Sequence, residues 1–234
     1  MKIGKITYNG TASDSFGLIV AGAGSFDAAE PDMTAYSVPG RNGDIIRDFG
    51  RYQNIEIAYP AFIVHDFAEN IRDFANALLE PVDYVRIEDT YHPDEYRMGI
   101  LAAGMSVDPV AWLAAGRFEI VFNCRPERFL KNGETAVEYT TSGSITNPTR
   151  MAAKPLIRVY GSGNININGT PIIIASHSLS YIDIDCDLQE AFCGNVNANM
   201  YISLDEFPKL DSGANSVVLG GVTSIKLTPR WWQL

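Results

Sequence analysis

The strongest constraint on the fold is a series of short strand patterns in the last third of the chain, with no helical period between them. Turn residues separate these stretches, and Asn168-Gly169 is the dipeptide favoured in two-residue hairpins. The predicted strands are 155–160, 164–168, 170–175, 180–186, 200–204, 216–219 and 224–228. Strands this short and this closely spaced indicate a small antiparallel β-sandwich.

The first half of the chain is also rich in strand patterns, but its spacing is less regular. Strands are predicted at 2–8, 16–20, 54–64, 83–88, 97–107 and 116–124. A Gly-, Ala- and Asp-containing stretch over 22–32 is expected to be a loop. On the 116–124 strand, alternate residues share one face and should be buried. The residues of this face are Phe118, Ile120, Phe122 and Cys124.

One segment has the period of an amphipathic helix. Its apolar residues recur at helical spacing and share one face: Phe67, Ile71, Phe74 and Leu78. Asp66 is placed to cap the start, with Glu69 in the capping-box position, and Pro81 prevents continuation. We therefore predict a helix over about 67–79, with Phe74 buried against a sheet.

A polar, turn-rich stretch separates the two halves. Residues 140–149 contain mostly Thr, Ser, Gly and Asn, and 131–134 read as a turn. The expected organisation is a β-sandwich or barrel-like domain with one helix over 1–130, a linker over 131–152, and an antiparallel sandwich over 153–234. The chain is thus expected to be mainly β.

A hairpin signal in the first half carries more apolar surface than a free loop tip should. Pro39-Gly40 and Asn42-Gly43 shape its turn between β-capable flanks. We expect this hairpin to pack on a neighbouring subunit; the alternative is that it folds back on its own domain. The residues of this expected oligomer interface are Val38, Pro39, Gly40, Arg41, Asn42, Gly43, Ile45, Ile46, Phe49 and Tyr52.

The charge distribution argues against a nucleic-acid-binding protein. The formal net charge is −10, and residues 1–130 hold 11 basic and 19 acidic groups, against 7 and 9 in the remainder. A surface that binds polyanions would show a basic excess. The N-terminus has no apolar signal region, and the apolar runs are too short to span a bilayer. We expect no secretion and no membrane span.

The sequence gives no expectation of a metal site. Asp183, Asp185 and Asp187 resemble the start of a calcium loop, but Leu188 and Gly194 occupy positions where that loop needs Gly and Glu. The spacing also fits a strand with a solvated acidic face, which is the interpretation we favour. Of the three cysteines, Cys186 and Cys193 are too few ligands for zinc, and Cys124 is expected to be a buried inert thiol; we expect all three to be reduced.

No catalytic or cofactor-binding residues are expected. The histidines are His65, His92 and His177, and no G-x-S-x-G elbow accompanies them. Aromatic residues make up 11% of the chain. Trp231 and Trp232 are adjacent and point to opposite faces of an extended strand, so at least one should lie on a surface or an interface. Core or interface packing is the expected role of the aromatics, and a ligand platform is the alternative.

Several segments, taken in order, form a recognisable pattern. The first runs from Tyr36-Ser37-Val38-Pro39-Gly40-Arg41-Asn42-Gly43-Asp44-Ile45 through Gly50-Arg51-Tyr52-Gln53-Asn54-Ile55. The later segments are Tyr181–Cys186, Glu190-Ala191-Phe192, Phe207-Pro208-Lys209-Leu210, Gly213-Ala214-Asn215 and Pro229-Arg230-Trp231-Trp232. Together they span nearly the whole chain, and in this order they resemble siphophage distal tail proteins, the Dit family.

The resemblance implies a structural protein of the virion tail tip, made in the cytoplasm of a host bacterium. It implies a galectin-like C-terminal sandwich and a homo-hexameric ring. The implied partners are the tail tube protein, the tape-measure protein and the tail-associated hub protein, and DNA passes through the lumen without specific binding. From the charge we expect an acidic or neutral lumen. The alternative is a lectin-like module that binds host glycan, although the residues after Arg150 leave no room for an inserted carbohydrate-binding domain.

Overall fold

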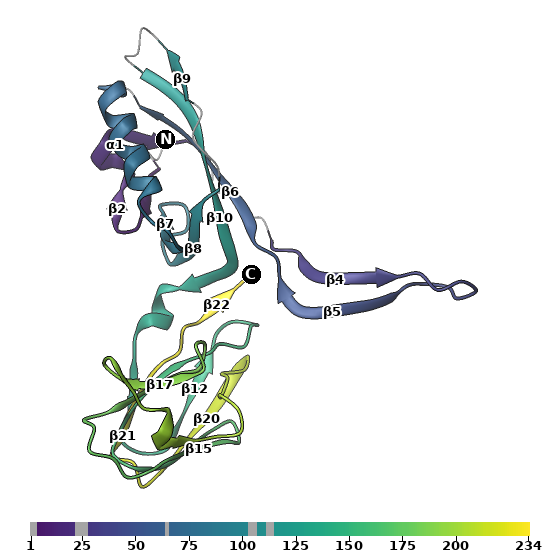
Figure 1. Ribbon diagram of the computed structural model, residues 1–234, viewed down its shortest axis with the longest axis vertical. Coiled ribbons are helices and arrows are strands. Elements are labelled where there is room, and N and C mark those ends of the chain that lie inside the picture. The colour runs from purple at the N-terminus through teal and green to yellow at the C-terminus, as the bar shows by residue number, and fades with distance from the viewer. Residues whose placement is uncertain (1–3, 22–27, 64–65, 103–106, 111–114) are drawn as a thin grey trace. The chain divides into compact units, whose positions relative to one another are not determined.

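The computed structural model describes residues 4–21, 28–63, 66–102, 107–110 and 115–234, and it divides the chain into two compact units. The first unit runs to Arg128 and includes Leu234; the second comprises Phe129–Gln233. The described residues form many antiparallel strands and one α-helix (Figure 1). The prediction of a mainly β chain is confirmed.

A single antiparallel sheet organises the first unit. Its strand order is β2-β1-β7-β8-β10-β6-β3, and β9 also pairs with β10. The strands are β1 (Ile6–Tyr8), β2 (Thr11–Ala12), β3 (Leu18–Val20), β6 (Ile55–Ile63), β7 (Val85–Asp89), β8 (Glu95–Leu101), β9 (Val107–Val110) and β10 (Ala115–Leu130), with a 3₁₀ turn, η1, at Ser13–Phe16. The pairing of β6 with β10 runs without a break from Ile63 opposite Gly116 to Ile55 opposite Cys124. Parts of the predicted strands 2–8 and 97–107 lie outside the described residues.

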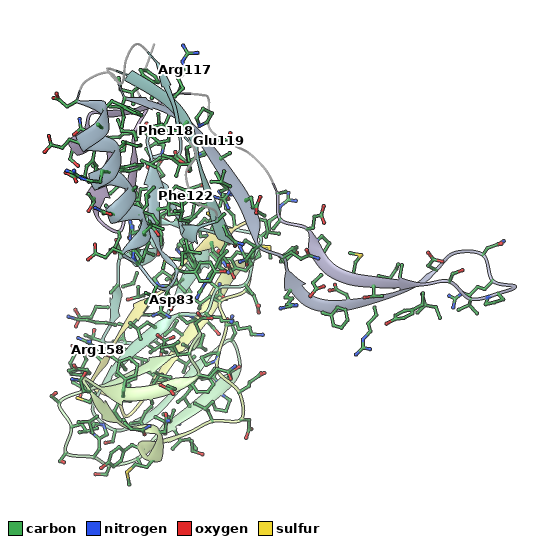
Figure 2. The ribbon with its side chains drawn as sticks, turned by 45° about the horizontal axis from the view of Figure 1, so that its top comes forward. Asp83, Arg117, Phe118, Glu119, Phe122 and Arg158 are labelled. Carbon is green, nitrogen blue, oxygen red and sulfur yellow. The ribbon has the colours of Figure 1, made fainter. Side chains whose placement is uncertain are left out.

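The core of the first unit forms where the alternating apolar residues of these strands meet. As predicted, one face of β10 is buried: Phe118, Ile120, Phe122 and Cys124. The Phe122 ring lies 5.1 Å from the Tyr8 ring and 6.0 Å from the Tyr59 ring, measured between centroids. Figure 2 shows Phe118 and Phe122 among the side chains that fill this interior.

Helix α1 (Phe67–Leu79) has the predicted bounds and packs its apolar face on the same core. Phe74 is buried, with its ring 5.5 Å from Phe16 and 6.5 Å from Phe118. The predicted side-chain cap is wrong. Asp66 has φ 46° and makes no side-chain cap, because a capping side chain needs extended backbone at that residue. Its carbonyl oxygen instead accepts from the amides of Glu69 and Asn70.

The second unit is a sandwich of two antiparallel sheets. Their strand orders are β11-β21-β13-β16-β17-β18 and β12-β20-β14-β15-β19. The strands are β11 (Val137–Tyr139), β12 (Gly143–Asn147), β13 (Leu156–Tyr160), β14 (Gly163–Ile167), β15 (Thr170–Ile174), β16 (Ile182–Asp185), β17 (Glu190–Cys193), β18 (Val196–Asn197), β19 (Ile202–Ser203), β20 (Gly213–Gly220) and β21 (Ser224–Thr228); β22 (Trp232–Gln233) pairs with β10, and 3₁₀ turns η2 and η3 lie at Lys131–Glu134 and Asn199–Tyr201. The predicted hairpin at Asn168-Gly169 joins β14 to β15, and both residues have the positive φ that such a turn requires.

The linker predicted over 131–152 is wrong. This stretch belongs to the second unit and supplies β11 and β12, which pair with β21 and β20 at the outer ends of the two sheets. The buried Asn147 amide donates to the carbonyl oxygens of Met151 and Leu210, at 2.9 and 3.0 Å. An end strand contacts the core along little of its length, so its sequence need not alternate. Its polar composition therefore looked like a linker.

A separate two-stranded sheet is formed by β4 (Pro31–Tyr36) and β5 (Ile45–Tyr52). The predicted hairpin is therefore present, but its first strand starts earlier than expected. Pro31 and Asp32 lie in β4, so the loop predicted over 22–32 is wrong at its end; residues 22–27 lie outside the described residues.

The contacts of Phe74 generate a stability prediction. Replacing Phe74 by Ala should lower the free energy of unfolding by ~3–5 kcal/mol, because the cavity would open between α1 and the sheet. Leu79 on the same helix is 66% exposed, so Leu79→Ala is the matched control and should cost less than ~1 kcal/mol. Urea unfolding measures both. Equal losses in the two variants would show that α1 contributes little to the core.

Candidate functional site

The candidate site is the β4–β5 hairpin, residues 31–52, which we call the arm. Its strands pair in register from Met33 opposite Asp48 to Tyr36 opposite Ile45, and Figure 1 shows them running side by side as a long ribbon. At the tip, the Arg41 amide donates to the Val38 carbonyl at 3.2 Å. Gly40 and Gly43 both have φ near 80°, which favours glycine. The tip is therefore a defined turn.

The arm exposes large apolar side chains. Ile46 is 55% exposed and Phe49 is 48% exposed. The remaining members of this set are also exposed: Met33, Tyr36, Val38 and Ile45. None of them belongs to the hydrophobic cores of either unit. The expectation that this hairpin carries unburied apolar surface is thus met by the geometry of the single chain.

Both faces of the arm are apolar. Residues directly opposite, and residues two apart on one strand, share a face. One face carries Tyr36, Ile45 and Phe49, with the Arg47 guanidinium 5.1 Å from the Phe49 ring centroid. The other face carries Met33, Ala35 and Ile46, with the Asp48 carboxylate opposite Met33. A ribbon of two strands cannot cover either face with its own residues.

Several polar groups at the base of the arm, in contrast, find partners within it or where it joins the chain. Arg51 donates to the Asp32 carboxylate at 2.6 Å, and the Gly50 amide donates to the Asp48 carboxylate at 2.8 Å. The Gln53 amide donates to the Glu30 carbonyl at 2.8 Å, where the chain enters and leaves the arm. What the arm lacks is therefore a surface that covers its apolar side chains.

The structure places the predicted interface residues in one continuous region. The tip holds Val38, Pro39, Gly40, Arg41, Asn42 and Gly43, all exposed, and β5 holds Ile45, Ile46, Phe49 and Tyr52. Sequence reasoning missed Met33 and Tyr36 on β4. The length of β5 was the available signal, because a strand over 45–52 in a hairpin requires a partner of similar length before the turn.

The predicted solvated acidic face at 183–187 is wrong for Asp183 and Asp185, whereas Asp187 is exposed as predicted. Asp183 and Asp185 are buried, and two arginines bind them bidentately. Arg158 donates to both Asp183 oxygens, at 2.7 and 2.8 Å, and Arg230 donates to both Asp185 oxygens at 2.8 Å. These carboxylates are occupied as structural ion pairs. No group of potential metal ligands occurs among the described residues.

The cysteines and histidines do not assemble a reactive centre within the described residues. Cys124 is buried as predicted, and burial raises the pKa of its thiol to about 12. His92 faces the Asp89 carboxylate, with Nδ1 3.1 Å from Oδ1, and His177 Nε2 lies 3.2 Å from the Gly161 carbonyl oxygen. His65 lies outside the described residues.

An aromatic cluster lies on the six-stranded sheet of the second unit. The Arg158 guanidinium lies 4.1 Å from the Tyr181 ring centroid, and the Tyr160 ring packs edge-on against Tyr181 at 6.4 Å. Arg158, labelled in Figure 2, thereby covers one face of the Tyr181 ring. Of the two adjacent tryptophans, Trp231 is buried, whereas Trp232 is half-buried and donates through Nε1 to the Ala152 carbonyl at 3.0 Å.

Comparisons with known proteins agree with this architecture. No family model matches the chain, and no curated protein matches it. Among solved structures, the Dit protein of phage SPP1, described as a paradigm of the hub adsorption apparatus of phages that infect Gram-positive bacteria, is similar over 100% of both chains, with a TM-score of 0.73 and 15% identity. Two structures of the phage P2 baseplate in its activated conformation, with Ca and with Sr, match 96% of this chain and 97% of theirs, with TM-scores of 0.52 and 0.51 and 10% identity. The chain has the Dit fold.

Among the described residues, no helix has the length and apolar character needed to cross a bilayer.

The buried Asp185 generates a prediction on acid stability. Burial raises its pKa, but hydrogen bonds from Arg230 and from the backbone amides of Leu188 and Asp187 outweigh burial, so the pKa is lowered overall. A carboxyl whose pKa is lowered by folding stabilises the fold above its unfolded value, ~4, and that contribution is lost as pH falls through the folded pKa.

Asp185→Asn should therefore be less stable than wild type at neutral pH, and the difference should shrink at pH ~3. Asp187 is exposed and pairs with Lys154 at the surface, so Asp187→Asn is the control and should follow the wild-type pH curve. Urea unfolding across the pH range measures this. A constant difference between Asp185→Asn and wild type would show that the ion pair does not set the acid sensitivity.

Proposed function

We propose that this chain is a structural hub protein of a phage tail tip, which forms a hexameric ring through its arm and joins the tail tube to the tail-associated protein below. One observation carries the proposal: a shaped ribbon with two exposed apolar faces, in a chain that has the Dit fold over its whole length. It is a role in assembly, without catalysis or a cofactor.

Burial energetics support a second copy as the partner of the arm. Fully burying a large apolar side chain stabilises by ~1.5–3 kcal/mol, and the arm offers several such side chains. We propose that the arm binds a different surface on its partner, which makes the contact head-to-tail rather than a two-fold pairing of one arm with another. A head-to-tail contact of this kind either closes into a ring or continues as a filament. The resemblance to distal tail proteins favours a closed six-fold ring.

The proposed partners follow from the same resemblance. They are the tail tube protein, the tape-measure protein and the tail-associated hub protein, and the proposed location is the tip of the virion tail. We assign the second unit as the galectin-like sandwich of the hub. We do not favour glycan binding by this unit, because Arg158, which Asp183 holds through a hydrogen bond, covers one face of the Tyr181 ring.

The proposed role of the arm as the contact between subunits, which we call the clasp, is tested by placing a charge on the arm. Ile46→Asp should convert the wild-type oligomer into a folded monomer, because a buried unpaired carboxylate is costly in an apolar interface. The matched control is Val82→Asp, which makes the same kind of change at a residue that is 96% exposed outside the arm. Sedimentation velocity measures the mass of each species, and circular dichroism checks the fold.

The wild type and Val82→Asp should sediment as the same oligomer of six copies. Deleting residues 38–48 should also leave a folded monomer. If Ile46→Asp sediments with the wild type, or if the wild type is monomeric at every concentration, the arm is not the clasp.

The charge distribution gives a prediction on DNA. The first 130 residues contain 11 basic and 19 acidic groups, so we propose a ring lumen lined mainly by acidic and neutral groups. Lining cations would hold DNA by counterion release, which would slow its passage. The oligomer should show no measurable binding to duplex DNA at physiological salt in an electrophoretic mobility shift assay. Salt-dependent binding would contradict this assignment.

A further inference from the structure

The chain contains four Asn-Gly steps, and they differ in how strongly the surrounding structure restrains them. They are Asn9-Gly10, Asn42-Gly43, Asn132-Gly133 and Asn168-Gly169. An Asn-Gly step is chemically labile, since glycine has no Cβ to keep its amide nitrogen away from the preceding side-chain carbonyl carbon. Reaction requires a free amide side chain and a backbone that can bend towards it.

Asn168-Gly169 is held on both reacting groups. The Asn168 Nδ2 donates to Asn215 Oδ1 at 2.5 Å, and Asn168 Oδ1 accepts from the Ser216 amide at 2.9 Å. The attacking nitrogen is also engaged, since the Gly169 amide donates to Asn166 Oδ1 at 2.8 Å. Neither group can move towards the other unless the turn opens.

Asn132-Gly133 is held by packing. Gly133 is buried, and a Cβ built on it would lie 2.4 Å from the Trp231 backbone nitrogen. Its carbonyl oxygen accepts from the Arg230 amide at 2.8 Å. Bending this backbone would require the chain around Trp231 to move.

Asn9-Gly10 is exposed, but its backbone is unfavourable. Asn9 has φ 49°, in the left-handed region. In that region the next amide nitrogen points nearly opposite to the side chain, which lengthens the path of attack.

Asn42-Gly43 has none of these protections. Both residues are exposed, and Asn42 is not among the described residues with positive φ. Within the described part of the chain no hydrogen bond to the Asn42 side chain occurs, and a Cβ built on Gly43 would meet nothing within 4 Å. This step lies at the tip of the arm, between Arg41 and Asp44.

We propose that Asn42 is a site of spontaneous deamidation in the unassembled chain. The Gly43 amide nitrogen attacks Asn42 Cγ; the new N–Cγ bond forms as the Cγ–Nδ2 bond breaks, and ammonia leaves with the proton of the Gly43 amide. Water then opens the resulting succinimide at either carbonyl. The products are an aspartate or an isoaspartate, which carries the backbone through the side-chain carbons.

The effect of deamidation on assembly rests on the proposed function of the arm as a subunit clasp. Either product adds a carboxylate to the tip, and the isoaspartate also lengthens the turn between Gly40 and Gly43. Both changes oppose docking into an apolar interface. Chains that have assembled keep Asn42 shielded, whereas chains that remain free lose the ability to assemble with time.

The chemical part is tested by peptide mass spectrometry on full-length protein aged in mildly alkaline buffer, with and without guanidinium chloride. Unfolded, the four steps should convert at comparable rates. Folded and dilute, Asn42 should keep nearly its unfolded rate, whereas Asn132 and Asn168 should slow by about tenfold or more, because they react only after local opening. Asn42→Gln is the control that removes the reactive step. Protection of Asn42 equal to that of Asn168 would overturn the proposal.

The assembly part is tested on the same aged sample after separation by size. The product should accumulate in the monomer and be depleted in the oligomer, and Asn42→Asp should assemble less than Asn42→Gln. Fast conversion of Asn42, with equal amounts of the deamidated product in the monomer and the oligomer, would overturn the effect on assembly. It would leave Asn42 as a site of deamidation. A wild type that never forms an oligomer would overturn the proposed role of the arm in assembly. The ranking of the four Asn-Gly steps by deamidation rate would remain as an independent result.

Discussion

A two-stranded ribbon has two faces and two edges, and it can bury none of them by itself. The arm meets this constraint with polar groups that pair internally, such as Arg51 with Asp32, and with apolar groups that do not. Large apolar side chains such as Ile46 and Phe49 stay in water as long as the chain is alone. The chain therefore contains a shaped apolar surface that its own residues leave exposed.

The described residues of the two units outside the arm build hydrophobic cores within the chain, in contrast to the arm. In the second unit, even the buried carboxylates of Asp183 and Asp185 have bidentate arginine partners within the same sandwich. In the first unit, Phe74 and Phe122 lie among other aromatic rings. Exposed apolar residues elsewhere, such as Val82, do not form a shaped element with two apolar faces. The apolar surface of the arm is a local property, and that makes an interface the economical explanation.

Much of the fold could be predicted from sequence where a local signal matched the final environment. Helix α1 was predictable because its apolar period is complete and Pro81 limits it, and Asn168-Gly169 specifies a tight turn. Such signals act within a few residues of where they stand. Their meaning does not depend on distant parts of the chain.

The misses have the opposite character. The sequence over 131–152 looks like a linker, because the pairing partners of β11 and β12 come from the far end of the chain. Asp183 and Asp185 alternate with apolar residues as a solvated face would, and only the three-dimensional placement of Arg158 and Arg230 shows that they are buried. The arm was recognised by its turn, while the β4 contribution was hidden by Pro31 and Asp32, which are typical of loops. The surface that we propose as the partner of the arm could not be predicted from local pattern either, because the proposal places it on another molecule.

Hydrogen exchange of the arm amides at two protein concentrations tests the central claim most directly. If the arm clasps a second copy, peptides covering residues 31–52 should exchange more slowly in concentrated than in dilute solution, while peptides from α1 exchange at the same rate in both. This pattern would place the new protection on the arm and on the surface that receives it. Exchange of the arm that does not depend on concentration, in a sample that has oligomerised, would contradict the account.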